Sequence, residues 1–97
     1  MIQVEWDVNA LSRHEEWAFN IALEYSLKHA QSYLNDIQNA IANISHHPSI
    51  GTDYPSSVRK NLKRLVTGLG YSISYELDSV DKPAKAKIVA IIRGQKN

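Results

Sequence analysis

The residues of this sequence best suited to chemistry are cations gathered in its second half. Four fall within six residues with no acidic residue between them, and two more lie near the carboxyl end: Arg59, Lys60, Lys63, Arg64, Arg93 and Lys96. A guanidinium group binds phosphate through paired hydrogen bonds, and an ammonium group acts as a point charge. The cluster therefore indicates a surface for an anionic partner, although an ordinary solvent-exposed charged face would show the same pattern.

The two halves of the chain carry opposite charge. Residues 1–58 contain two basic and seven acidic residues, a net charge of −5, whereas residues 59–97 contain nine basic and three acidic residues, a net charge of +6. The formal net charge of +1 for the whole chain hides this asymmetry. An excess of one sign in one half favours a partner of the opposite charge for that half.

Length and composition exclude several classes of protein. A chain of 97 residues is long enough for one core, so residues 1–97 are expected to form a single domain. The absence of cysteine excludes disulfide frameworks, thiolate nucleophiles and cysteine-ligated zinc. No apolar run approaches the roughly 20 residues of a membrane helix, and the first residues lack a signal-peptide pattern. We expect a soluble, cytoplasmic protein with no membrane partner.

Two successive helices are expected in the first half of the chain. Residues 2–8 alternate between apolar and polar side chains, which is typical of a half-buried strand. An amphipathic helix follows, capped by Asn9 or Ser12 and ending near Lys28. A second amphipathic helix must end before Pro48, because proline disfavours helical geometry in its predecessor. The short connection between the two helices predicts an antiparallel hairpin.

The second half of the chain is expected to supply three strands. After a loop at residues 48–58, these strands fall at residues 62–67, 71–77 and 87–92, separated by a turn at 68–70 and a hairpin loop at 78–85. The last strand is apolar on both faces, which favours the middle of a sheet. The sequence thus predicts an α+β fold of order β-α-α-β-β-β, with a helical hairpin packed on one face of a small antiparallel sheet. In the middle strand of the three, alternation directs Tyr71, Ile73, Tyr75 and Leu77 toward the core and Ser72, Ser74 and Glu76 toward solvent.

The four histidines offer no metal site. His14 and His29 fall on or between the predicted helices, behind the sheet. His46 and His47 fall at a helix carboxyl end, where the helix dipole favours a partly protonated imidazole. Adjacent helical residues project about 100° apart, so such a pair chelates a metal poorly. We therefore expect neither a metal nor a cofactor.

The order of these features resembles the RelE/ParE family of toxins over essentially the whole chain. The helical hairpin is followed by Pro48-Ser49-Ile50-Gly51, by a basic strand containing Leu62-Lys63-Arg64-Leu65 and by a strand with tyrosines at its ends, residues 71–75. The closing strand, residues 88–94, ends in a basic residue and a glycine. No single motif is specific, and the order and spacing of the set carry the resemblance. Membership of the family implies a cytoplasmic toxin that a cognate antitoxin protein neutralises.

The family contains two kinds of toxin with different targets. RelE-like members enter the ribosome and cut messenger RNA, whereas ParE-like members inhibit DNA gyrase without nuclease activity. A shared fold does not choose between them, so the site residues must. The resemblance places Arg64 at the position that binds the scissile phosphate in the nucleases, with Lys63 and Arg93 as further catalytic candidates.

The chemistry for RNA cleavage is incomplete in this sequence. Attack by a 2′-hydroxyl group needs a base, an acid and cations that stabilise the charge on phosphorus. Family nucleases that cut efficiently place a tyrosine or histidine after the last strand, whereas the tail here is Gly94-Gln95-Lys96-Asn97. Lys63 or Lys96 could act as the base only if it lost its proton near neutral pH. The sequence therefore favours a ParE-like inhibitor of DNA gyrase, with an endonuclease that cuts messenger RNA on the ribosome as the alternative.

The expected binding surface joins these cations to one loop tyrosine. Tyr54 lies in a predicted loop, where an exposed ring could stack on a base or contact a protein. We expect Arg59, Lys63, Arg64 and Arg93 on the exposed side of the sheet or at its rim, away from the helices. The residues expected to bind the target or the antitoxin are Arg59, Lys60, Lys63, Arg64, Arg93, Lys96 and Tyr54.

Overall fold

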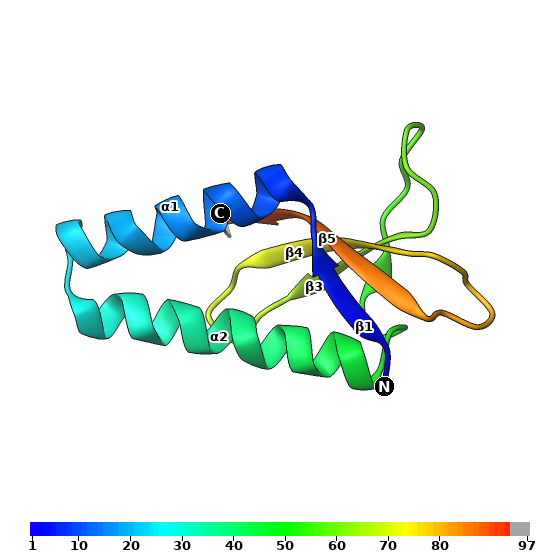
Figure 1. Ribbon diagram of the computed structural model, residues 1–97, viewed down its shortest axis with the longest axis horizontal. Helices are drawn as coiled ribbons and strands as arrows, with labels where there is room; N and C mark the ends of the chain where they lie inside the picture. The colour runs from blue at the N-terminus through cyan, green and yellow to red at the C-terminus, as the bar shows by residue number, and fades with distance from the viewer. Residues whose placement is uncertain (94–97) are drawn as a thin grey trace.

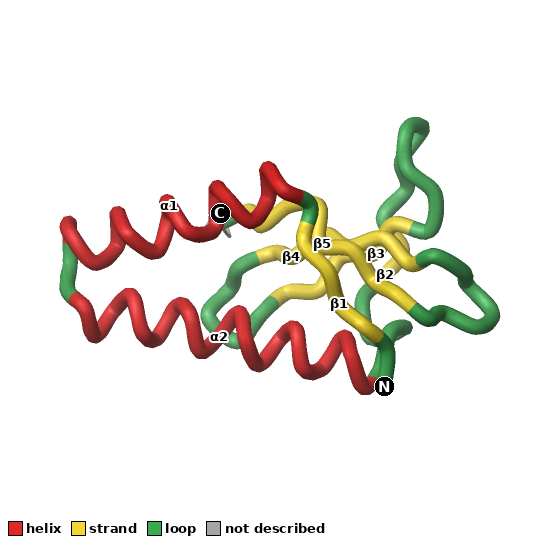
Figure 2. Tube along the Cα trace, in the orientation of Figure 1, coloured by secondary structure: helices red, strands yellow, loops and turns green. Residues whose placement is uncertain are grey.

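The computed structural model describes residues 1–93, which form two helices and a five-stranded sheet (Figure 1). The elements follow one another as β1 (Gln3–Trp6), α1 (Val8–Glu24), α2 (Leu27–His46), β2 (Thr52–Asp53), β3 (Leu62–Val66), β4 (Ser72–Leu77) and β5 (Lys85–Ile92). The helices form a hairpin that packs on the sheet and extends past it, while the loops after β2 and β4 project on the opposite side (Figure 2). Within the described residues, no helix is long and apolar enough to cross a membrane.

Both helices of the hairpin begin at side-chain caps. The Asp7 carboxylate accepts hydrogen bonds from two backbone N–H groups in the first turn of α1, at 3.1 and 3.2 Å. The Ser26 hydroxyl accepts one from the first turn of α2, also at 3.1 Å. These caps satisfy N–H groups that have no partner within a helix. The first helix therefore starts after Asp7 and not at the predicted caps, Asn9 or Ser12, and it ends before Ser26 and not near Lys28.

The sheet is mixed, with strand order β1-β5-β4-β3-β2. β5 lies between β1 and β4, which confirms the prediction that the last strand is inside the sheet. β1 runs parallel to β5, so the prediction of an antiparallel sheet is wrong at this edge. Alternation shows which face of a strand is buried, and it does not encode the direction of the neighbouring strand. The two-residue strand β2 forms within the predicted loop 48–58 and pairs with β3.

β4 departs from the predicted alternation at Ser74. Ile73 and Tyr75 are fully buried as predicted, but only 4% of Ser74 is exposed. In the register of the sheet, Ser74 lies between Arg64 of β3 and Ala90 of β5. A small side chain beside a long one is shielded from water even on an open face of a sheet. The register with β5 shifts between Ser74 and Tyr75, which marks a β-bulge.

The core lies between α2 and the central strands. Tyr33, Ile37 and Ile44 of α2 are almost completely buried. They belong to one cluster with Ile73 of β4 and Ile88 of β5, which are also fully buried. Burying such a side chain contributes about 1.5–3 kcal/mol to stability. α2 is thereby fixed to the sheet, and α1 is held in place by its contacts with α2 and β5.

A buried tyrosine fixes the chain as it leaves α2. The Tyr75 hydroxyl donates a hydrogen bond to the carbonyl oxygen of Pro48 at 2.8 Å and accepts one from the backbone N–H of Gly51 at 3.0 Å. A Cβ atom at residue 51 would lie 2.7 Å from this hydroxyl and 2.9 Å from the carbonyl oxygen of Arg64. Only glycine fits such a close approach. The Pro-x-x-Gly step is therefore a structural element, which we call the Tyr75 clamp.

Removing the Tyr75 hydroxyl is expected to destabilise the protein. Tyr75→Phe keeps the ring but leaves the Pro48 carbonyl and the Gly51 N–H without their partner, so the free energy of unfolding should fall by about 1–3 kcal/mol. Urea denaturation measures this change. Tyr25→Phe is the matched control, because Tyr25 is 63% exposed and surface substitutions usually stay within about 0.5 kcal/mol. Equal losses in the two variants would contradict the clamp.

Candidate functional site

Lys63 lies on the helix-covered face of the sheet. It pairs in register with the buried Tyr75, and only 16% of its side chain is exposed. Its ammonium group donates hydrogen bonds to the Asp53 carboxylate at 2.8 Å and to the Gly51 carbonyl oxygen at 3.5 Å. Adjacent residues of a strand point to opposite faces, so Lys63 and Arg64 cannot share one. The prediction that both lie on the exposed side is wrong for Lys63.

Arg64 lies on the open face of the sheet, as predicted, and contacts Tyr54. Its guanidinium carbon is 5.5 Å from the centroid of the Tyr54 ring, within the range of a cation–π interaction. Arg64 pairs in register with Thr52 of β2, and Tyr54 follows directly after that strand. The structure thus brings together two residues that were predicted to bind a partner. They present a cation beside a flat aromatic surface, which suits an anion attached to a planar group.

The other two cations of the cluster lie on the loop between β2 and β3. The Arg59 guanidinium forms an ion pair of 2.8 Å with Glu76 of β4. Arg59 is exposed, as predicted, and Lys60 is exposed as well. An exposed ion pair contributes about 0–1 kcal/mol, so Arg59 can exchange Glu76 for another anion at little cost. Three of the four clustered cations therefore contact an acidic or aromatic side chain of the same chain. The cluster does not converge on one phosphate-sized site.

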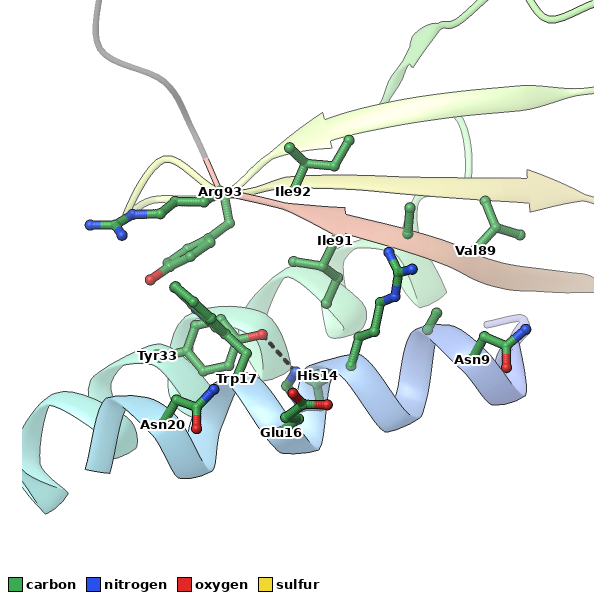
Figure 3. Close-up of a pocket in the computed structure, with 14 residues that line it drawn as sticks. Asn9, His14, Glu16, Trp17, Asn20, Tyr33, Val89, Ile91, Ile92 and Arg93 are labelled. Carbon is green, nitrogen blue, oxygen red and sulfur yellow. Dashed lines mark hydrogen bonds between the residues drawn. The ribbon is translucent and has the colours of Figure 1, made fainter. Parts of the chain in front are cut away.

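Arg93 lies apart from this cluster, beside α1. Its guanidinium carbon is 5.7 Å from the centroid of the Trp17 ring. The prediction that Arg93 lies away from the helices is wrong, because β5 runs beside α1 and ends next to the middle of that helix (Figure 3). Lys96, the remaining predicted site residue, lies outside the described residues, together with the rest of the tail at 94–97.

Arg93 lines a groove of about 610 Å³ between α1 and the end of β5 (Figure 3). α1 contributes Trp17 to one wall, residues 89–93 form the other, and Tyr33 and Tyr71 reach the groove from α2 and from the start of β4. This volume falls in the range of ligand-binding sites, about 300–1,000 Å³. This groove was not predicted from the sequence, although a tryptophan beside the apolar side of a helix was a signal that could have pointed to it.

The groove contains a half-buried, uncharged network. His14 Nδ1 and the Tyr33 hydroxyl share a hydrogen bond of 2.8 Å (Figure 3), and the His14 ring stacks on Trp6 with 4.7 Å between ring centroids. Tyr71 meets Tyr33 edge-on at 4.9 Å. Burial lowers the pKa of His14 from its usual 6.5, against the opposite effect of Glu15, and burial also raises the pKa of Tyr33. Both groups are therefore neutral at pH 7.

The indole N–H of Trp17 is buried and has no hydrogen-bond partner within residues 1–93. Buried polar groups in proteins are paired in about nine cases of ten, because an unpaired donor costs about 1–3 kcal/mol. This N–H group belongs to a residue that lines the groove. Because this nitrogen is buried, a ligand in the groove could reach it only if the indole ring moved.

The two regions are better equipped for binding than for moving protons. Among residues 1–93, no three His, Asp or Glu side chains lie close enough together to hold a metal ion. Beside Arg64 on the open face lies the Tyr54 ring, and the ion pair of Lys63 with Asp53 lies on the opposite face of the sheet. His14 lines the groove, whose walls do not include Arg64. The surface around Arg64 can therefore bind anions and planar groups, and the groove can bind a mainly apolar ligand.

Comparisons with known proteins show the fold. No protein-family model and no curated protein sequence matches the chain. Among solved structures, a chain of the chromosomal ParDE TA system from P. aeruginosa has a TM-score of 0.73 and 17% identity, with 98% of both chains covered. A chain of the intact E. coli RelBE toxin–antitoxin complex has a TM-score of 0.61 and 9% identity, with 99% of this chain and 100% of that chain covered. The isolated E. coli RelE toxin has a TM-score of 0.64 and 9% identity, with 100% and 88% covered. The fold of this chain is the fold of these proteins, as the resemblance predicted.

Lowering the pH is expected to destabilise the protein through His14. Its pKa in the folded state lies below the value near 6.5 of the unfolded chain, so the unfolded state binds the proton more readily. The contribution to stability is complete above about pH 6.5 and falls as the pH drops below that value. Urea denaturation from about pH 7.5 to about pH 5.5 measures the slope.

His14→Gln should flatten this slope, because the glutamine side chain does not titrate. Gln38→Asn, at an exposed position of α2, is the matched control and should keep the slope of the unsubstituted protein. The role given to His14 fails if its variant loses stability with falling pH as steeply as the control does.

Proposed function

We propose that this chain is the toxin of a type II toxin–antitoxin pair of the RelE/ParE type, neutralised by a cognate antitoxin protein. The fold supports this proposal, because it matches chains of ParDE and RelBE systems over nearly the whole length of each, with TM-scores between 0.61 and 0.73. The motifs that carry the resemblance in the sequence add independent support. They lie together in the structure, with the Pro48-to-Gly51 step bonded to the tyrosine of β4.

We further propose that the target is DNA gyrase, as it is for ParE-like toxins. One observation carries this choice: Lys63, one of the three cations proposed for catalysis, is paired with Asp53 on the face of the sheet opposite Arg64, so the two cannot act on one phosphate. A nuclease needs cations free to bind the phosphate, together with a positioned acid and base. Recognition of a protein instead favours arginine and tyrosine held on a fixed surface, which is what Arg64 and Tyr54 provide.

The alternative function is RelE-like cleavage of messenger RNA on the ribosome. The contact between Arg64 and Tyr54 favours this alternative, since the guanidinium group could bind a phosphate while the ring stacks on a base. Lys63 could not carry the proton at that phosphate, because it points to the opposite face of the sheet. Arg93 would take no part, because it lines the separate groove beside α1.

Two assays on the purified protein decide between these targets. The toxin is added to a gyrase supercoiling reaction and, at the same concentration, to a translated message whose cleavage is followed by primer extension. We expect inhibited supercoiling and an intact message, because each missing acid or base typically costs about 10²–10⁴-fold in rate. Codon-positioned cuts with normal supercoiling would reverse the assignment to the endonuclease. No effect in either assay would exclude both targets and leave the antitoxin pairing to be judged separately.

Replacing Arg64 is expected to weaken inhibition of the target without unfolding the protein. Arg64→Ala removes an exposed cation beside Tyr54, so the concentration needed for half-inhibition should rise about tenfold, which corresponds to about 1.4 kcal/mol and one charged hydrogen bond. Urea denaturation should give a stability close to that of the unsubstituted protein. Lys82→Ala, on the exposed loop between β4 and β5, is the control for loss of one positive charge. Undiminished inhibition by Arg64→Ala would remove this surface from target binding.

A further inference from the structure

A second cleft lies between the loop that follows β2 and the loop that follows β4, which project from the sheet away from the helical hairpin (Figure 2). Its volume is about 480 Å³, within the range of about 300–1,000 Å³ that is typical of ligand-binding sites. The buried Leu62 and Leu77 line it from the sheet, and Tyr54, Lys60 and Val80 line it from the two loops. No residue of the groove beside α1 contributes to it, so the two sites are separate.

Hydrogen bonds hold the loop between β2 and β3 in the shape that forms one wall of this cleft. The Ser56 hydroxyl accepts hydrogen bonds from the backbone N–H groups of Val58 at 3.2 Å and of Arg59 at 3.1 Å. Asn61 has a φ of 56°, in the left-handed region that few residues other than glycine adopt. Its side-chain amide donates to the carbonyl oxygen of Leu77 at 3.3 Å, and its own carbonyl oxygen accepts from the Leu77 N–H at 3.2 Å. The cleft is therefore formed before a ligand arrives, which reduces the entropy lost on binding.

Apolar side chains are exposed to water around the cleft. Val80 is 63% exposed and Tyr54 is 43% exposed, and Val58, on the same loop as Tyr54, is 88% exposed. The sheet beneath them presents the apolar side chains of Leu62 and Leu77. A partner that covers such a surface gains affinity from each apolar side chain that it removes from water.

The charged residues of the cleft favour a ligand that also carries carboxylates. Arg59, Lys60 and Lys63 line the cleft together with one carboxylate, that of Asp53. Asp53 pairs with Lys63, and Glu76 of β4 pairs with Arg59, both at 2.8 Å, so carboxylates of the chain itself already occupy two of the three cations. Lys60 forms no ion pair within residues 1–93. A carboxylate brought by a partner can therefore pair with Lys60, and it can replace Glu76 at Arg59 because that ion pair is exposed.

The same residues favour a protein segment over a nucleic acid. The carboxylates of Asp53 and Glu76 would repel a phosphate backbone, and a net charge of +1 gives the chain little attraction for a polyanion. An apolar side chain next to one or two carboxylates, by contrast, matches both parts of the cleft. Tyr54 also joins the cleft to the surface around Arg64, which lies 5.5 Å from its ring, so one partner can cover both.

We propose that the cleft between the β2–β3 and β4–β5 loops binds an acidic segment of the target protein, with an apolar side chain of that segment beside Tyr54 and Val80 and a carboxylate paired with Lys60 and Arg59. This inference rests on the proposed gyrase target and adds the place and the chemistry of the contact.

Val80→Ser tests the apolar part of the contact. The purified chain, labelled at its amino terminus, is titrated with purified gyrase holoenzyme in the absence of DNA, and fluorescence anisotropy gives Kd. We expect Kd to rise about tenfold, because the variant lacks an apolar side chain that the complex buries. Val8→Ser, at the start of α1 and 80% exposed, is the matched control and should leave Kd unchanged. Both substitutions are at exposed positions, so urea denaturation should show no loss of stability.

Lys60→Gln tests the charged part of the contact in the same titration. Binding should weaken, and its dependence on salt should decrease, because one ion pair with the target is lost. Lys82→Gln is the matched control, since Lys82 is exposed on the β4–β5 loop and does not line the cleft. This control should change neither the affinity nor its salt dependence.

Photo-cross-linking identifies the occupant of the cleft. A photoreactive amino acid is placed at position 58, whose side chain is almost fully exposed, and the toxin is irradiated with gyrase and DNA together. We expect a cross-linked gyrase peptide that contains aspartate or glutamate next to apolar residues. Cross-links to DNA, to a second copy of this chain or to a gyrase segment without carboxylates would overturn the inference.

The outcomes separate this inference from the function on which it rests. If gyrase binds Val80→Ser and Lys60→Gln as tightly as the unsubstituted protein, the cleft is not the contact site, and the gyrase target stands. If gyrase neither binds the unsubstituted protein nor is inhibited by it, the gyrase target is overturned, and the inference with it.

Discussion

The hydrogen bonds of the Tyr75 hydroxyl determine where the chain goes between the helical hairpin and the edge of the sheet. These bonds hold both ends of the turn after α2. The residues that follow the turn therefore lie beside β3 and pair with it as β2. Because β2 is paired there, Asp53 reaches Lys63 and Tyr54 reaches Arg64. The partners of the basic residues on the surface therefore depend on a contact made in the core. A single hydroxyl links the packing of β4 to the electrostatics of the candidate target surface.

Hydrophobic periodicity predicted the elements of this fold, and it could not predict all their pairings. The helical hairpin, its end before Pro48, the three strands of the second half and the internal position of β5 all follow from local patterns. The parallel pairing of β1 and the existence of β2 depend on contacts between backbones far apart in the sequence, which side-chain alternation does not encode. The start of α1 was misplaced for a different reason, since Asp7, Asn9 and Ser12 are all good caps and only the structure shows which is used.

The candidate site was predicted only in part, because a charge pattern gives neither the face to which a side chain points nor the position of its strand. The charge pattern located the exposed Arg59 and Arg64, and it grouped Lys63 with them. Side chains alternate between the two faces of a strand, so Lys63 points to the face opposite Arg64. Arg93 was grouped with them by charge alone, whereas its position depends on where β5 ends relative to α1. Local patterns gave at most Trp17 as a signal for the groove, because the groove arises from a mismatch in length: β1 has four residues and β5 has eight, so half of β5 extends past its neighbour.

The groove that results from this mismatch lies apart from the surface around Arg64. The groove lies beside β5, and Arg64 lies on β3, two strand spacings or about 10 Å away across the sheet. A segment confined to the groove would leave Arg64 and Tyr54 uncovered, because neither residue lines it. Direct cover of that surface needs at least about three further extended residues beyond the groove. On the open face between the groove and Arg64, the neighbours of Arg64 in the register are the small residues Ser74 and Ala90, which present little steric obstacle to an extended chain. Ser74 itself is covered, with only 4% exposed, so an extended chain that crosses this face would contact the side chains around Ser74 and not Ser74.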